Sequence, residues 1–147
     1  MIIYIDSCCY GRPQDEQTQL RIIIETIAIR GIIDLCRVAG HSIVGSPTVA
    51  AEIQRNPDAK IRDATMDFFL QTVDRIISPS ADVIKRAQDL HAQGLGPVDS
   101  LHLALAEVAG VDVLITVDDD FEKICTNKKL SAVRVINLLK FIQEVII

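Results

Sequence analysis

The sequence predicts an α/β protein, a three-layer α/β/α sandwich around a mainly parallel sheet of about four to five strands. Short β-branched apolar runs alternate along the chain with longer segments of helical periodicity. Runs such as Ile2–Ile5 are apolar at every position, as in strands that helices cover on both faces. The 147 residues, 49% of them hydrophobic, can bury one core, so we expect a single domain over residues 1–147.

The N-terminal third predicts two strands joined by a long helix. The first strand is Ile2–Ile5, and a loop is expected at residues 11–13. Apolar residues then recur at helical spacing over residues 14–39. A straight helix of that length would measure about 39 Å, longer than a small domain, so we expect a bend or break near Gly31. The second strand is predicted over residues 42–45.

Helices fill the middle of the chain. Ser46-Pro47 is typical of an N-cap followed by proline in the first helical turn, and the helix that begins there carries Glu52. Two amphipathic helices are expected at about 58–76 and 80–93, because Ser78-Pro79 separates them.

The last third returns to alternating helices and strands. A turn at residues 94–97 precedes it. The expected elements are a helix at 98–109, a strand at 113–116, a short helix at 119–129, a strand at 133–136 and a helix at 138–146. Helical crossovers between successive strands indicate a mainly parallel sheet.

The composition argues against several classes of protein. Charged residues interrupt each apolar run well before the ~20 residues that a membrane-spanning helix needs, and no signal-peptide pattern precedes Asp6. We therefore expect a cytoplasmic protein without membrane contact. Its four cysteines lack metal-site spacing, which favours free thiols in a reducing compartment. A net charge of −5 gives no overall positive field for nucleic acid.

Acidic residues follow the predicted strands. Asp6 ends the first strand, Glu52 lies one short helix past the second, Asp99 opens the helix after the 94–97 turn, and Asp118 follows the third strand. Since parallel strands end at one edge of the sheet, these carboxylates should converge. Their repulsion calls for a cation, and hard oxygen ligands suit Mg²⁺ or Mn²⁺. Such an ion can activate water against a phosphodiester, which is nuclease chemistry.

Each acidic residue also has a structural interpretation. Asp99 could cap its helix, and the acidic run 118–120 could complement a helix dipole. Asp6 could be a turn residue, and Glu52 a solvated helix residue. The four acidic residues taken together favour a shared site more strongly than any one of them does.

In this combination the chain resembles the PIN-domain family, the metal-dependent ribonuclease fold found in many VapBC-type toxins. The resemblance covers essentially the whole chain and rests on the strand ending in Asp6-Ser7 and on residues 46–52, 99–104 and 114–121. It implies that the metal ligands are Asp6, Glu52, Asp99 and Asp118, with Asp120 as an auxiliary candidate. It also implies supporting roles for Ser7 and for Thr116, which would orient the site by hydrogen bonding.

Residues 6–17 are similar to a PIN subgroup with a Cys-Cys pair and an Arg-Pro loop. Arg12 could contact the scissile phosphate there, although a structural loop arginine fits equally well. Cys8 and Cys9 are expected to pack in the core, because hard metals disfavour thiolates. His102 lies three residues after Asp99 and within reach of the site, but the sequence favours a buried structural histidine.

The leading expectation is an Mg²⁺- or Mn²⁺-dependent endoribonuclease acting on single-stranded RNA, either a toxin with an antitoxin partner or an RNA-processing enzyme. A PIN-like DNA nuclease is an alternative, although flap-type relatives use more carboxylates and longer insertions. A catalytically silent PIN-like binding module is another, although none of the four carboxylates is missing. A receiver-type phosphoacceptor would need clustered acids after the first strand and a lysine after the last, where the chain has Asp6 and Asn137.

Isoleucines occur on several faces of the predicted helices. Such surfaces tend to be covered by a partner, so we expect a homodimer. The candidate surfaces are residues 14–39 and 141–147.

Overall fold

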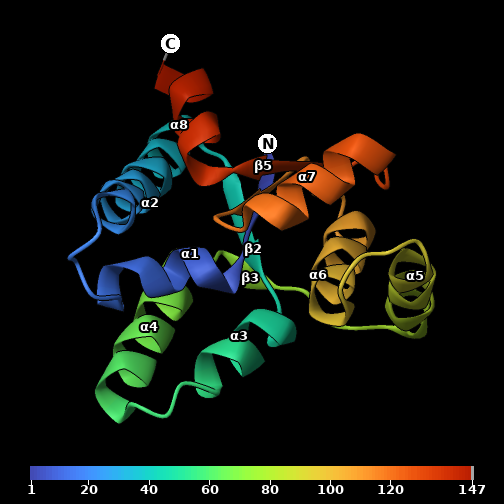
Figure 1. The fold of residues 1–147 in the computed structure, drawn as a ribbon, viewed down its shortest axis with the longest axis horizontal. Coiled ribbons are helices and arrows are strands. Elements are labelled where there is room, and N and C mark those ends of the chain that lie inside the picture. The colour runs from blue at the N-terminus through green and yellow to red at the C-terminus, as the bar shows by residue number, and fades with distance from the viewer. Residues whose placement is uncertain (147) are drawn as a thin grey trace.

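A five-stranded parallel sheet forms the centre of the computed structural model, which describes residues 1–146 (Figure 1). The strand order is β3-β2-β1-β4-β5, and Tyr4 of the central strand pairs with Val44 on one side and Leu114 on the other. The strands are β1 (Ile2–Ile5), β2 (Ser42–Gly45), β3 (Arg75–Ile76), β4 (Val113–Thr116) and β5 (Arg134–Asn137).

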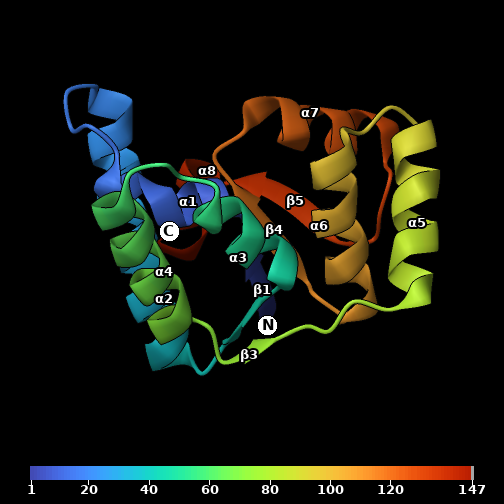
Figure 2. The same cartoon turned by 90° about the horizontal axis from the view of Figure 1, so that it is seen from below.

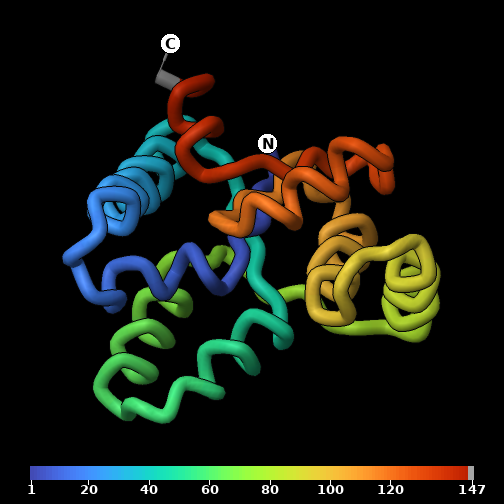
Figure 3. The backbone as a smooth tube through the Cα atoms, viewed as in Figure 1, coloured from blue at the N-terminus to red at the C-terminus, as the bar shows by residue number. Residues whose placement is uncertain are grey.

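Helices cover both faces of this sheet, which confirms the predicted three layers. They are α1 (Ser7–Gly11), α2 (Leu20–Ala39), α3 (Pro47–Gln54), α4 (Ala59–Thr72), α5 (Ala81–Ala92), α6 (Pro97–Val108), α7 (Asp119–Lys128) and α8 (Leu138–Ile146), with a 3₁₀ turn η1 (Arg12–Gln14). Helices α2 and α4 lie on one face and α5 and α6 on the other (Figure 2). The C-terminal α8 packs beside α2 (Figure 3). Among the described residues, no helix has the length and apolar character needed to cross a bilayer.

The core is built from aliphatic and aromatic side chains of both layers. Tyr10 is buried and packs edge-on against Phe68 and Phe69. The four cysteines carry free thiols, and all of them except the partly exposed Cys8 are buried. This agrees with the expectation that Cys9 is a packing residue.

The long predicted helix at 14–39 is shorter than expected. It begins at Leu20, because the residues before it form the end of η1 and a turn over 15–19. Its 20 residues measure about 30 Å, so the length that suggested a break does not exist. The helix continues through Gly31, where an added Cβ would lie 3.6 Å from Cδ1 of Ile142 in α8. The predicted break near Gly31 is therefore wrong.

The predicted helix at 58–76 also ends early. Helix α4 stops at Thr72, and Arg75–Ile76 pairs with β2 as the edge strand β3. The backbone N–H of Asp74 donates to the carbonyl of Ile43 (2.8 Å), and the Asp74 carboxylate accepts from the N–H of Ile43 (2.8 Å). These bonds turn the chain onto the sheet, although two residues are too few for a strand pattern to show.

The loop expected at residues 11–13 is instead the end of α1 and the start of η1, and the remaining boundaries agree with the prediction to within about one residue. The predicted cap of α3 is present, since the N–H of Val49 donates to Oγ of Ser46 (3.2 Å) and Pro47 is the first helical residue. Gly45, just before it, lies against α4. A Cβ at this position would come within 2.6 Å of the Phe69 ring and 2.9 Å of Val73. Only glycine lets α4 approach β2 this closely.

Candidate metal centre

The acidic residues gather at the carboxyl edge of the sheet. The chain moves from β1 to β2 and β3 on one side and then returns to β4 and β5 on the other, so the winding reverses beside β1. Ligand sites form at such reversals, past the strand ends. Asp6 follows β1 directly, and its backbone N–H donates to the carbonyl of Ile115 in β4 (2.9 Å). The side chain of Asp6 is thereby held next to the end of β4, and the residue is only 5% exposed.

Thr116 connects Asp6 to Asp118. This buried last residue of β4 donates its hydroxyl to Oδ2 of Asp6 (3.0 Å) and accepts a bond from the backbone N–H of Asp118 (3.0 Å). Asp118 is in turn the N-cap of α7, where its Oδ1 accepts from the N–H groups of Asp120 and Phe121 (3.0 and 3.2 Å). The carboxylate of Asp118 therefore has a capping role, as the structural interpretation expected.

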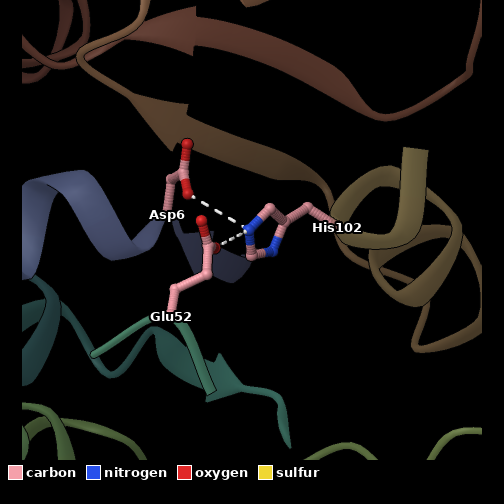
Figure 4. Close-up of side chains that lie close together, drawn as sticks. All are labelled: Asp6, Glu52 and His102. Atoms are coloured by element: carbon pink, nitrogen blue, oxygen red, sulfur yellow. Dashed lines mark hydrogen bonds and ion pairs between the residues drawn. The ribbon is translucent and has the colours of Figure 1, made fainter. Parts of the chain in front are cut away.

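Glu52 and His102 approach Asp6 from two other elements (Figure 4). Nε2 of His102 lies 2.5 Å from Oε1 of Glu52 and 3.4 Å from Oδ1 of Asp6. The hydroxyl of Ser7 donates to the same Glu52 oxygen (2.9 Å) and lies 3.4 Å from Oδ1 of Asp6. Asp6, Glu52 and His102 offer ligand atoms that all lie within 4.8 Å of one another.

Asp99 lies in the first turn of α6 without capping it, since the N-cap is Gly96 and makes no side-chain cap bond. The pKa of Asp99 is raised to about 6, first by burial and then by the negative charges of Asp6 and Asp118. The four carboxylates therefore share one electrostatic environment, and among them the ligand atoms of Asp6 and Glu52 lie within 4.8 Å of each other, whereas Asp99 and Asp118 do not belong to that close group.

His102 lies within this negative environment and hydrogen-bonds to Glu52. Burial alone would raise the pKa of Glu52, but the hydrogen bond and charge of His102, with the bond from Ser7, outweigh burial and lower it. For His102, burial would lower the pKa, yet the bond to Glu52 and the charges of Asp6 and Glu52 raise it. A nitrogen donor thus lies between two carboxylates that would otherwise repel each other.

The other residues proposed from the sequence have contacts of their own. Arg12 donates to buried Glu25 (Nε to Oε1, 3.0 Å) and to Asp15 (Nη1 to Oδ2, 2.7 Å), an arrangement that favours its structural interpretation. Asp120 is exposed in the first turn of α7. Cys8 is not only a packing residue, because its thiol donates to Oδ2 of Asp6 (3.3 Å).

A family model described as the PIN domain matches residues 5–127, a span that contains all four acidic residues. This chain belongs to the PIN-domain family. No curated protein sequence gives a significant match to it.

Solved structures support the same fold for this PIN domain. The VapBC2 structure from Rickettsia felis, bound to a DNA fragment from its promoter, aligns with a TM-score of 0.62 and 17% identity over 93% of this chain and 98% of that one. VapC20 of Mycobacterium tuberculosis, described as a sarcin-ricin loop cleaving toxin, aligns with a TM-score of 0.61 and 17% identity over 90% of this chain and 98% of that one. VapBC-1 from nontypeable Haemophilus influenzae aligns with a TM-score of 0.57 and 18% identity over 95% of this chain and 99% of that one.

Two buried residues, Tyr4 and Ser46, support the site of this PIN domain, although neither of them is assigned to it from the sequence. The Tyr4 hydroxyl lies 2.6 Å from Nδ1 of His102 and 2.6 Å from Oγ of Ser46. A signal was present, because Tyr4 precedes Asp6 by two positions, the spacing that places strand residues on one side. The spacing of His102 from Asp99 predicts that it lies within reach of the site, but the sequence favours a structural role for it.

The donor set of the PIN domain fits a divalent cation. Carboxylate oxygens predominate, and the negative charges of Asp6 and Asp118 add to burial in raising the pKa of Asp99. Mg²⁺ and Mn²⁺ favour such hard oxygen donors.

Proposed function

We propose that this PIN domain, one domain over residues 1–147, is a divalent-metal-dependent endoribonuclease that hydrolyses phosphodiester bonds of single-stranded RNA. The observation that carries the proposal is the grouping of Asp6 and Glu52, whose ligand atoms lie within 4.8 Å, with the charges of Asp6, Glu52 and Asp118 all acting on Asp99. When bound there, Mg²⁺ or Mn²⁺ would lower the pKa of a water molecule and neutralise charge on the phosphate.

The protein residues have separate tasks in this proposal. Asp6 and Glu52 would hold the ion most closely, and Asp99 and Asp118 would complete the acidic ring, with Asp120 as an auxiliary. Ser7 and Thr116 bind the carboxylates of Glu52 and Asp6, which limits the orientations that those carboxylates can take. Fixed carboxylates avoid a reorganisation cost when the ion and the substrate bind.

RNA is favoured over DNA by the PIN resemblance and by the likeness to VapC20, which is described as a cleaving toxin of the sarcin-ricin loop. The compact chain has no long insertion among its described elements in which further carboxylates could lie. Its free thiols are in keeping with a cytoplasmic location.

We propose an antitoxin protein and a second copy of the chain as partners. Two of the similar structures are VapBC assemblies. Helix α2 also exposes large apolar side chains along its length, namely Leu20, Ile24, Ile27, Leu35 and Val38. Beside them, residues of α2 and α8 line an apolar cavity of about 270 Å³. Of the segment 141–147 proposed from the sequence, Ile147 lies outside the described residues.

Cleavage assays test the activity directly. The protein is incubated with pools of single-stranded RNA and single-stranded DNA in Mg²⁺, Mn²⁺ or EDTA. We expect RNA cleavage that needs the metal, a loss of about 100-fold or more in Asp6→Asn and a smaller loss in Asp120→Asn. The exposed Asp67→Asn on α4 is the matched control and should retain full activity.

Three outcomes would contradict this proposal. Full activity in EDTA would exclude a metal mechanism. Cleavage of DNA alone would favour the DNA nuclease, and metal binding without any cleavage would favour a silent binding module.

A further inference from the structure

A chain of buried side chains joins the elements that carry the acidic residues. Tyr4 lies on β1, two residues before Asp6. Its hydroxyl contacts Ser46 and His102, each at 2.6 Å. All three side chains are at most 1% exposed, and the ring of Tyr4 also packs edge-on against that of His102.

Each of these three side chains belongs to an element that positions one carboxylate. Ser46 is the N-cap of α3, the helix that carries Glu52. His102 lies one turn after Asp99 in α6. The hydroxyl of Tyr4 is therefore the point at which β1, α3 and α6 are held together beneath the acidic cluster.

With the His102 imidazole neutral, the protons of this series of side chains can be assigned in one direction. Oγ of Ser46 accepts from the N–H of Val49, so its own O–H can donate to Tyr4. Tyr4 then donates to Nδ1 of His102, which places the ring proton on Nε2. That N–H faces Glu52 at 2.5 Å and Asp6 at 3.4 Å. Every donor has an acceptor, and the last donor acts on the proposed metal ligands.

We propose that Tyr4 and His102 are positioning residues that set the affinity of the acidic cluster for its divalent cation. They hold the carboxylates of Glu52 and Asp6 at one separation without contributing negative charge. The inference rests on the proposed function only for the presence of the cation. Partners that orient metal ligands from behind typically change metal affinity by about 10- to 100-fold when they are removed.

Tyr4→Phe tests the proposal, because it removes one hydroxyl and keeps the ring. The chain supplies a matched control in Tyr10→Phe, since Tyr10 is also fully buried and its hydroxyl has no hydrogen-bond partner among the described residues. Mn²⁺ binding is followed by the electron paramagnetic resonance signal of the free ion, and thermal unfolding is measured in EDTA. We expect the Kd for Mn²⁺ to rise about 10-fold or more in Tyr4→Phe and to be unchanged in Tyr10→Phe.

A second variant covers the case in which Tyr4→Phe does not fold. His102→Gln keeps an N–H donor near Glu52 but loses the bond to Tyr4. It should weaken Mn²⁺ binding as well, and the double variant should bind no more weakly than the weaker single variant, because both remove one shared bond.

The outcomes separate the two proposals. If the wild-type protein binds no Mn²⁺, both the proposed function and this inference are wrong. If the wild type binds Mn²⁺ and Tyr4→Phe binds it equally well, whatever its thermal stability, the inference alone is wrong. Additive losses in the double variant would also overturn it.

Discussion

Arg21 holds Asp119 with two parallel hydrogen bonds, Nη1 to Oδ2 at 2.9 Å and Nη2 to Oδ1 at 3.0 Å. Nη2 also donates to the carbonyl of Val117 (3.2 Å). The arginine on α2 therefore binds the segment on both sides of Asp118, a proposed metal ligand, although it lies 98 positions away from Asp119 in the sequence.

Arg21→Lys should reduce RNA cleavage more than it reduces stability. Lysine cannot form the two parallel bonds, so the segment around Asp118 should shift, and a displacement of about 1 Å at a catalytic group can cost about 100-fold in rate. Both partners are about half exposed, so the loss in unfolding free energy should stay below about 1 kcal/mol. Single-turnover cleavage and urea unfolding measure the two effects. Arg37→Lys, an exposed arginine of the same helix, should change neither; equal rate losses in the two variants would refute the positioning role.

Asp99→Asn should stabilise the metal-free protein at neutral pH. The pKa of Asp99 is about 6 in the folded state against an ordinary value of 3.8, so the folded state binds the proton more tightly. Its contribution to stability is therefore present at low pH and is lost as the pH rises from about 4 to about 6. Asparagine does not ionise, so the variant does not lose this stability as the pH rises.

In EDTA at pH 7.5 we expect the Asp99→Asn variant to gain about 1 kcal/mol, after allowance for solvent screening, or roughly 2 to 4 °C in Tm. The gain should vanish near pH 4, and Mg²⁺ should stabilise the variant less than the wild type. Thermal scans across this pH range measure it, with Asp67→Asn as control. A gain of the same size at pH 4 would show that Asp99 is not the titrating group.

Asp118 should respond differently to asparagine and to alanine. Asparagine retains an oxygen that can accept from the N–H groups of Asp120 and Phe121, whereas alanine loses the cap at a cost of about 1 kcal/mol. In EDTA, Asp118→Asn should be as stable as the wild type or more stable, because one repelling charge is gone. Both variants should respond less to Mg²⁺, which stabilises the wild type by about 1.4 kcal/mol at ten times its Kd. If Asp118→Asn is clearly the less stable protein in EDTA, the charge of Asp118 serves the helix and not a metal.

The homodimer is tested by its mass in solution. Light scattering at micromolar concentration should give twice the 16.2 kDa of one chain. Ile27→Lys should shift the mass toward the monomer, because Ile27 is 67% exposed on the apolar side of α2. Ile84→Lys, at a comparably exposed position on α5, should leave the dimer intact. A monomeric wild type, or equal effects of the two substitutions, would reject α2 as the interface.

Much of the fold could be predicted because its signals are local. Four of the five strands are apolar runs between charged or turn residues, and the Ser46-Pro47 cap identifies the start of α3. The single-turn α1 and the two-residue β3 could not be found, because neither is long enough for a period to show. The bonds of Asp74 to Ile43 that direct the chain into β3 are a tertiary feature.

The candidate site likewise has one part that the sequence predicts and another that it does not. Residues at strand ends must come together in a parallel sheet, so the neighbourhood of Asp6 and Asp118 followed from topology alone. The contact between Tyr4 and His102 spans 98 residues and depends on how closely α6 packs against β1. Nothing in either local segment specifies that distance.

Substitution of Gly45 should disturb the site although the residue does not belong to it. A methyl group there would collide with Phe69 and Val73, and the strain would be relieved by moving either α4 or the end of β2. The next residue along the chain is Ser46, whose hydroxyl supports Tyr4. A random mutagenesis screen for loss of ion binding should therefore recover substitutions at residue 45, although a glycine has no side chain with which to touch a ligand.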